Sequence, residues 1–253
     1  MKKAVIYLLA FTVAEVVTVV VHPMWGMVCH VVVLAVVIAH SAIASERRYR
    51  ELFLSLALVP LIRIVSLSMP LANIPQLWWY PIIYAPLLVA AFVVVRMLGY
   101  RVGEVGLNFR ALPIQLAVSL SGFLFGVAEY FILRKPQPAI SEFVWQDVWL
   151  MALIFLTCTG FVEEFIFRGV LQRSTEGVFG RWSIIYVSVV FAVAHFIHYA
   201  EVGLLGVLAD VAFVFVVAMF FGWVVRKTGS LLGVSLAHGI TNTILYLVAP
   251  FFL

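Results

Sequence analysis

Charged residues are scarce in this chain. They make up 11% of its 253 residues, whereas 65% are hydrophobic. Soluble domains carry about 25% charged residues and roughly half apolar ones. One aqueous core cannot enclose so much apolar surface, so the composition excludes an ordinary soluble domain and indicates a protein that crosses a membrane several times. The net charge of +4 comes from basic residues in short loops, and it does not indicate a nucleic-acid partner.

Cysteine is also rare, and strict apolar–polar alternation is absent. The two cysteines, Cys29 and Cys158, lie within apolar segments without a metal-ligand spacing. This excludes a disulfide framework, and we interpret both as small buried hydrophobic residues. Because apolar and polar residues do not alternate along the chain, a transmembrane β-barrel is excluded. Helices remain as the structure that satisfies the backbone in lipid.

Nine apolar runs are long enough to cross a bilayer as helices. The break near residues 22–24 is short, so eight runs is an alternative. The sequence therefore predicts an all-α, polytopic bundle of eight or nine transmembrane helices in a lipid bilayer. The predicted spans are residues 4–21, 25–44, 52–69, 77–97, 113–133, 147–172, 182–199, 203–225 and 231–251.

Basic residues gather in alternate connections between these spans. This is the positive-inside pattern, and it places the N-terminus on the cytoplasmic side. Short basic loops and a compact size favour a prokaryotic cytoplasmic membrane. The residues concerned are Lys2, Lys3, Arg47, Arg48, Arg50, Arg96, Arg101, Arg110, Arg173, Arg181, Arg226 and Lys227; Arg134 and Lys135 are the exceptions.

A weak boundary lies between the linker at residues 99–112 and the PQP at residues 136–138. We expect residues 1–135 to form N-terminal transmembrane helices with a role in substrate selection or an accessory role. Residues 136–253 are expected to form the catalytic core, with the active site among the four C-terminal helices.

Ionisable groups at bilayer depth are costly unless they are paired or hydrated. In the first half they are single and scattered, and they are Glu15, His30, His40, Arg63 and Glu129. Arg63 is predicted to pair with either Glu15 or Glu129 between helices, which is a structural role.

The sixth span carries two adjacent carboxylates in the stretch FVEEFIFRGV. Glu164 and Arg168 are four residues apart, so they share a helix face and can form an ion pair. Glu163 is rotated by about 100° from its neighbour and is left free for another partner.

Two further spans supply imidazoles and an amide. His195 lies four residues after Phe191, which gives the imidazole an aromatic wall. His238 and Asn242 have the same spacing on the last span. A turn near residues 177–180 would bring Glu163 and His195 to a similar depth, and His238 meets them if the helices tilt.

A free carboxylate beside an imidazole is a pair that activates water. A second histidine and an amide can donate hydrogen bonds to a developing oxyanion. The chain has neither a GxSxG nucleophile motif nor an HExxH zinc helix. These residues therefore indicate a hydrolase for acyl bonds.

The three segments EEFIFR, FAVAH and HGITN resemble the motifs EExxxR, FxxxH and HxxxN. These motifs mark the CAAX-protease and bacteriocin-processing family of glutamate-dependent intramembrane proteases, whose type members are Rce1-like CAAX prenyl endopeptidases. The resemblance covers about residues 145–250. It implies cleavage of a membrane-associated protein or peptide without a cofactor. It further implies that Glu163 and His195 activate water, that His238 and Asn242 form the oxyanion hole, and that Glu164, Arg168 and Phe191 support the site.

Several alternatives stay open at this point. Glu163, His195 and His238 together form a His2Glu set that can bind catalytic zinc, although metal-free chemistry is preferred. A proton-coupled transporter would use intramembrane Glu and His residues, but no internal repeat supports it. A non-catalytic immunity or scaffold protein is the third alternative. Asp210 lies outside the motifs and its role is open, while His198 is interpreted as structural. The oligomeric state is not predicted.

Overall fold

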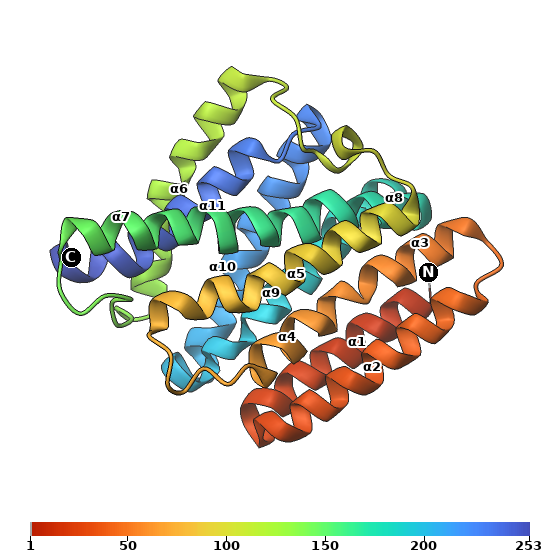
Figure 1. The fold of residues 1–253 in the computed structure, drawn as a ribbon, viewed down its shortest axis with the longest axis horizontal. Coiled ribbons are helices and arrows are strands. Elements are labelled where there is room, and N and C mark those ends of the chain that lie inside the picture. Colours follow the sequence, from red (N-terminus) through yellow and green to blue (C-terminus); the bar gives the residue numbers. More distant parts are fainter. Residues whose placement is uncertain (1) are drawn as a thin grey trace.

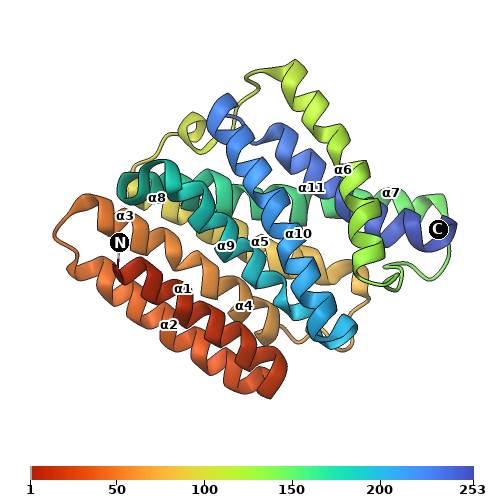
Figure 2. The same cartoon turned by 180° about the vertical axis from the view of Figure 1, so that it is seen from behind.

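The computed structural model describes residues 2–253. In that range the regular secondary structure is all helical, with loops between the helices and no strand (Figures 1 and 2). Seven helical runs are long and apolar enough to cross a membrane. The predicted fold class, an all-α polytopic membrane bundle, is confirmed. The runs are Lys2–Val21, Pro23–Ile43, Arg47–Ser68, Gln76–Leu98, Leu112–Ile132, Trp145–Thr228 and Leu232–Phe252.

The first two expected spans are separate helices lying side by side (Figure 1). Helix α1 (Lys2–Val16) continues as the π-helical segment η1 (Val17–Val21), and α2 spans Pro23–Ile43. Between them His22 is extended, with φ −171°. A residue before proline avoids the α-conformation, and proline is well suited to the first position of a helix. The sequence HP therefore ends one helix and starts the next.

Four further helices complete the first half. They are α3 (Arg47–Leu56), α4 (Leu58–Ser68), α5 (Gln76–Leu98) and α6 (Leu112–Ile132). The short 3-10 helix η2 (Val102–Val105) lies in the loop after α5. Helices α3 and α4 together occupy the third expected span.

The run Trp145–Thr228 has 84 residues, which at 1.5 Å per residue is about 126 Å and far exceeds a bilayer of about 30 Å. It folds back at two 3-10 turns, η5 (Gly180–Trp182) and η6 (His195–His198). The sixth, seventh and eighth expected spans therefore lie within this one run. Its other elements are α7 (Trp145–Ile154), the π-helical segments η3 (Phe155–Glu163) and η4 (Phe165–Leu171), α8 (Gln172–Phe179), α9 (Ser183–Ala194) and α10 (Tyr199–Thr228).

The last run consists of α11 (Leu232–Thr243), η7 (Ile244–Val248) and α12 (Ala249–Phe252). Helix α11 packs closely against η3 through glycines. A Cβ atom on Gly160 would lie 2.5 Å from the carbonyl oxygen of Ser235, and one on Gly239 would lie 2.6 Å from the Cα atom of Leu156. Small residues let membrane helices approach in this way, and here they bring the polar side chains of η3 and α11 together.

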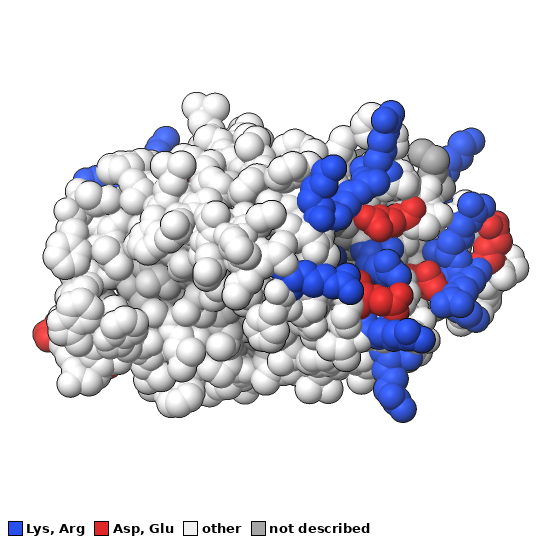
Figure 3. All heavy atoms as spheres, turned by 90° about the horizontal axis from the view of Figure 1, so that it is seen from above, with Lys and Arg blue, Asp and Glu red and all other residues white. Residues whose placement is uncertain are grey.

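The polarity of the molecule is that of a membrane protein. Large apolar side chains such as Trp149 and Leu205 are 69% and 79% exposed, whereas Glu164 and Asp210 are fully enclosed. Lys and Arg gather at one end of the molecule, and most of the remaining visible surface is uncharged (Figure 3). The protein is therefore an integral membrane protein.

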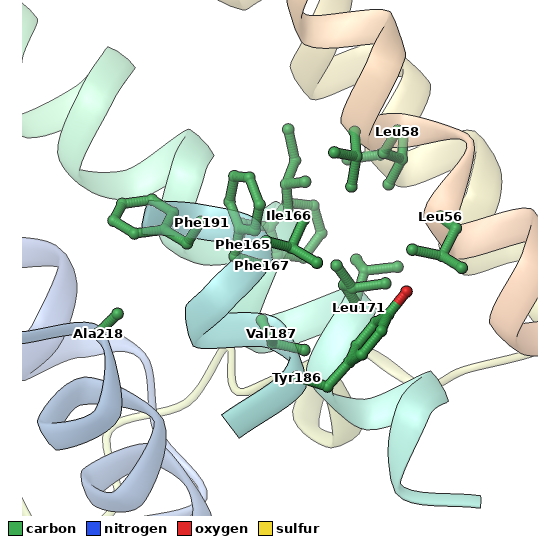
Figure 4. Packing of buried hydrophobic residues seen from close by; sticks show 14 of the residues in the cluster. Leu56, Leu58, Phe165, Ile166, Phe167, Leu171, Tyr186, Val187, Phe191 and Ala218 are labelled. Carbon is green, nitrogen blue, oxygen red and sulfur yellow. The ribbon is translucent and has the colours of Figure 1, made fainter. Parts of the chain in front are cut away.

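The main apolar core surrounds the segment that carries the two glutamates. Phe165, Ile166 and Phe167 on η4 are buried, together with Phe191 on α9 (Figure 4). This packing holds the backbone of η4 in place between neighbouring helices, so the adjacent carboxylates have defined positions.

Candidate active site

The two adjacent glutamates have different surroundings. Glu164 is fully buried, and its Oε1 atom lies 3.1 Å from the Arg168 guanidinium. The side chain of Glu163 keeps 16% of its area exposed and lines a cavity. The pairing of Glu164 with Arg168 follows the predicted spacing of four residues. The segment is π-helical rather than α-helical, which is a distortion often found at functional sites.

The ion pair of Glu164 is part of a buried network. Its Oε1 atom also accepts a hydrogen bond from Nδ1 of His238 on α11, at 2.9 Å. The guanidinium of Arg168 stacks over the Phe191 ring at 4.1 Å from the ring centre, a cation–π contact that is strong when desolvated. Glu164 and Arg168 thus hold His238 from outside the cavity lining, whereas Phe191 also lines the cavity.

Glu163 has two polar neighbours on other helices. The Tyr84 hydroxyl on α5 donates a hydrogen bond to its Oε1 atom. Its Oε2 atom lies 4.0 Å from Nε2 of His238. Glu163 therefore takes no part in the ion pair of Arg168. Its Oε2 atom points toward the His238 imidazole but is too far from it for a hydrogen bond.

His195 begins the turn η6 at the end of α9. Its Nδ1 atom lies 3.0 Å from the carbonyl oxygen of Phe191. A carbonyl only accepts, so Nδ1 carries the proton and Nε2 of the neutral ring is an acceptor. Among the residues that the structure describes, no hydrogen bond or ion pair joins His195 directly to Glu163.

Asn242 lies one helical turn after His238. Its Nδ2 atom donates to the Thr159 hydroxyl on η3 at 2.8 Å, and the Thr159 hydroxyl donates to the carbonyl of Phe155 at 2.8 Å. One amide N–H is thereby held by η3, and the second N–H of the same group is left for another acceptor.

These side chains line one cavity of about 360 Å³. Its walls come from both halves of the chain, so the polar groups of separate helices meet around a common space. The four residues predicted to be catalytic, Glu163, His195, His238 and Asn242, are all among those that line it.

The N-terminal half contributes groups that sequence reasoning did not assign to the site. Tyr80 and Tyr84 on α5 line the cavity, and neither belongs to a recognisable motif. Arg63 also lines it, and its guanidinium pairs with Glu15 at 2.8 Å. Glu15, one of the two partners predicted for Arg63, is thereby confirmed. The same guanidinium donates to the carbonyl oxygen of Ala194 at 2.9 Å, directly before His195.

His198, which lines the cavity, pairs with Asp210, which is buried behind it. Nδ1 of His198 lies 2.8 Å from Oδ2 of Asp210. The structure thus gives Asp210, whose role the sequence leaves open, a partner in His198. Any role of one residue therefore involves the other.

No group of three or more His, Cys, Asp or Glu side chains within residues 2–253 is placed to hold a metal ion. Glu163, His195 and His238 share the cavity, but they do not form such a group. Nδ1 of His238 is engaged by Glu164, and Nδ1 of His195 is engaged by a carbonyl. These bonds leave Nε2 of each ring free, as in a metal-binding imidazole, so the misfit to a zinc ion rests on the placement of the three side chains and not on their Nδ1 bonds.

Comparison with known protein families gives one match. Residues 144–244 match the family described as type II CAAX prenyl endopeptidase Rce1-like. The match covers less than half of the chain, and it includes all three motifs. No curated protein and no solved structure matches the chain.

Proposed function

Residues 144–244 match the family described as type II CAAX prenyl endopeptidase Rce1-like, and on this premise we propose that the protein belongs to that family and is an intramembrane endopeptidase. It hydrolyses a peptide bond of a membrane-associated protein or peptide precursor with a water molecule that Glu163 and His195 activate. Membership of the family implies a protease and therefore a hydrolase. Prenylated CaaX proteins are the substrate class that the family description names.

One observation carries the proposal: Glu163, His195, His238 and Asn242 line a single cavity within an apolar bundle. Oε2 of Glu163 accepts no hydrogen bond from the side chains described in the structure, so it can accept the proton of an attacking water. His195 offers an unprotonated Nε2 atom to the same water, because its Nδ1 atom donates to a carbonyl.

The oxyanion that forms at the scissile carbonyl needs donors. Asn242 has one free amide N–H, and the bond to Thr159 orients it. His238 donates from Nε2 when both of its nitrogens are protonated. That form balances the charges of the site, because an imidazolium and Arg168 together neutralise Glu163 and Glu164. Fixed donors enclosed by an apolar bundle stabilise a developing charge strongly.

We propose metal-free chemistry with no cofactor. The placement of Glu163, His195 and His238 supports this choice, because they form no metal-holding group within residues 2–253. The proton of the attacking water is taken by a side chain of the chain itself.

The proposed setting is the cytoplasmic membrane of a prokaryote, with the N-terminus and the basic end of the molecule on the cytoplasmic side. The gathering of Lys and Arg at one end supports this orientation (Figure 3). The proposed partners are the lipid bilayer and the substrate, and no nucleic acid.

The test compares membranes that contain the wild-type protein with membranes that contain the Glu163→Gln variant. New protein termini are identified by mass spectrometry. We expect termini that depend on the wild type and fall by at least about 10²-fold in the variant, as is typical for loss of a general base. Glu142→Gln is the matched control, because Glu142 is an exposed loop residue away from the cavity, and it should cleave normally.

Three results would contradict the proposal. Cleavage by Glu163→Gln at the wild-type rate would show that Glu163 is not the catalytic base. Full cellular function of this variant without cleavage would indicate a non-catalytic partner protein. Uptake of a solute into liposomes, driven by a proton gradient, would indicate a transporter.

A further inference from the structure

A second acid–base pair lies at the cavity, with its histidine in the wall and its carboxylate buried behind it. His198 closes the turn η6, and Asp210 lies on α10. Nδ1 of His198 is 2.8 Å from Oδ2 of the fully buried Asp210. The His198 ring centre is 5.9 Å from that of His195, and both rings line the cavity. We propose that His198 is the general acid that protonates the leaving amine and that Asp210 is its positioning residue.

The protonation pattern of the pair suits this role. A carboxylate only accepts hydrogen bonds, so Nδ1 of His198 carries a proton and Nε2 is the atom that exchanges protons. In the part of the chain that the structure describes, Nε2 has no hydrogen-bond partner, and it is not among the enclosed side-chain nitrogens. Nε2 is therefore accessible from the cavity that its ring lines.

The other two imidazoles of the cavity are less suited to donate this proton. Nδ1 of His195 donates to a carbonyl, which leaves Nε2 as an acceptor with no adjacent carboxylate to stabilise an imidazolium. His238 lies between Glu164 and Glu163, where its proton is needed by the oxyanion. His198 has a carboxylate of its own, since no arginine or lysine contacts Asp210 among the described ion pairs.

An amide needs such a donor because an amine is a poor leaving group until its nitrogen is protonated. The water oxygen bonds to the carbonyl carbon, and the water proton passes to the Glu163 carboxylate. The carbon–nitrogen bond then breaks, and the nitrogen takes the proton from Nε2 of His198. The proton on Glu163 returns to His198 through water in the cavity, which leaves a carboxylic acid and an amine as products.

This inference rests on the proposed function, and the experiment separates the two. A peptide that spans the cleavage site found by the terminus comparison is made in two forms, with the scissile bond as an amide or as an ester. An alkoxide leaves far more readily than an amide anion, so the ester needs much less help from an acid. The variants are His198→Gln and Asp210→Asn, with Ile197→Val as the matched control in the same cavity wall.

We expect His198→Gln to lower kcat/KM for the amide by about 10²-fold, as is typical for loss of a general acid, and for the ester by less than about tenfold. Asp210→Asn should show the same selectivity with a smaller loss, and Ile197→Val should resemble the wild type. The amide-to-ester ratio does not depend on how much protein is folded, so a merely structural role of His198 would not change it.

Equal losses on both peptides, or no loss, would overturn the role of His198. In either case Glu163→Gln still abolishes cleavage of both peptides if the proposed function holds. Cleavage of both by Glu163→Gln, or the finding of no cleavage site at all, would instead overturn the proposed function and this inference with it.

Discussion

The hydroxyl of Tyr84 on α5 donates a hydrogen bond to the carboxylate of Glu163 on η3. Tyr84 lies outside residues 144–244, the segment that matches the protease family. The candidate site is therefore completed by a helix of the N-terminal half. The bond engages Oε1 of Glu163 and directs Oε2 toward His238, so it determines which carboxylate oxygen faces the cavity.

Replacement of Tyr84 by phenylalanine should impair catalysis without disturbing the packing of α5. A hydrogen bond to a charged group contributes about 1.5–3 kcal/mol, which corresponds to a loss of roughly 10- to 100-fold in kcat/KM. Tyr80→Phe is the control, because Tyr80 lines the same cavity and its hydroxyl has no hydrogen-bond partner within residues 2–253. Steady-state kinetics on the purified variants measure the effect. Equal activity of both variants would show that the Tyr84 hydroxyl does not position Glu163.

Removal of Arg168 should destabilise the protein strongly. The Arg168→Met variant leaves Glu164 buried without its cation, and breaking a buried pair in this way costs about 3–5 kcal/mol. The double variant Glu164→Gln/Arg168→Met should recover a large part of this loss, because glutamine is neutral and still accepts from Nδ1 of His238. Thermal unfolding in detergent micelles measures both effects.

The control for this prediction is Arg173→Met. It breaks the ion pair between Arg173 and Glu104, whose side chains are 41% and 39% exposed, and an exposed pair contributes little to stability. If Arg168→Met melts at the same temperature as Arg173→Met, the buried network does not have the structural role inferred for it.

Contacts within one helix were the most predictable part of the site. Glu164 and Arg168 are four residues apart, and the regular spacing of a helix brings them together whatever the rest of the fold does. The pair of Arg63 with Glu15 spans 48 positions of the sequence, so the sequence left two candidate partners. The choice between them depends on how α4 packs against α1, which the spacing within either helix does not determine.

Other features have no local signal in the sequence. Tyr84 resembles any aromatic residue of an apolar span, and only the register of α5 against η3 makes it a partner of Glu163. His198 and Asp210 meet because the chain reverses at η6 and α10 is kinked at Gly203, where φ is 69°. The π-helical form of η3 and η4 likewise has no signal in the sequence, because a π-bulge leaves the apolar pattern nearly unchanged.

The hydroxyl of Thr159 should matter through Asn242. Thr159→Val keeps the size of the side chain and removes the acceptor that holds the Asn242 amide at 2.8 Å. A hydrogen bond of about 1 kcal/mol gives a fall in kcat of roughly fivefold to tenfold, with KM nearly unchanged because the oxyanion exists only in the transition state. Thr159→Ser retains the hydroxyl and should restore kcat. If serine and valine at this position behave alike, the hydroxyl does not orient the amide.

Treatment with a chelator should leave cleavage unchanged. Within residues 2–253 the polar groups of the cavity are not arranged as a metal-holding group. A zinc ion bound by Glu163, His195 and His238 would require these side chains to rearrange, whereas a water held by Glu163 would not. The measurement is the cleavage rate after dialysis against 1,10-phenanthroline, with metal analysis of the same sample and a known zinc protease as the control. Loss of activity that returns on addition of zinc, and on addition of no other divalent ion, would replace the glutamate mechanism with a zinc-dependent one.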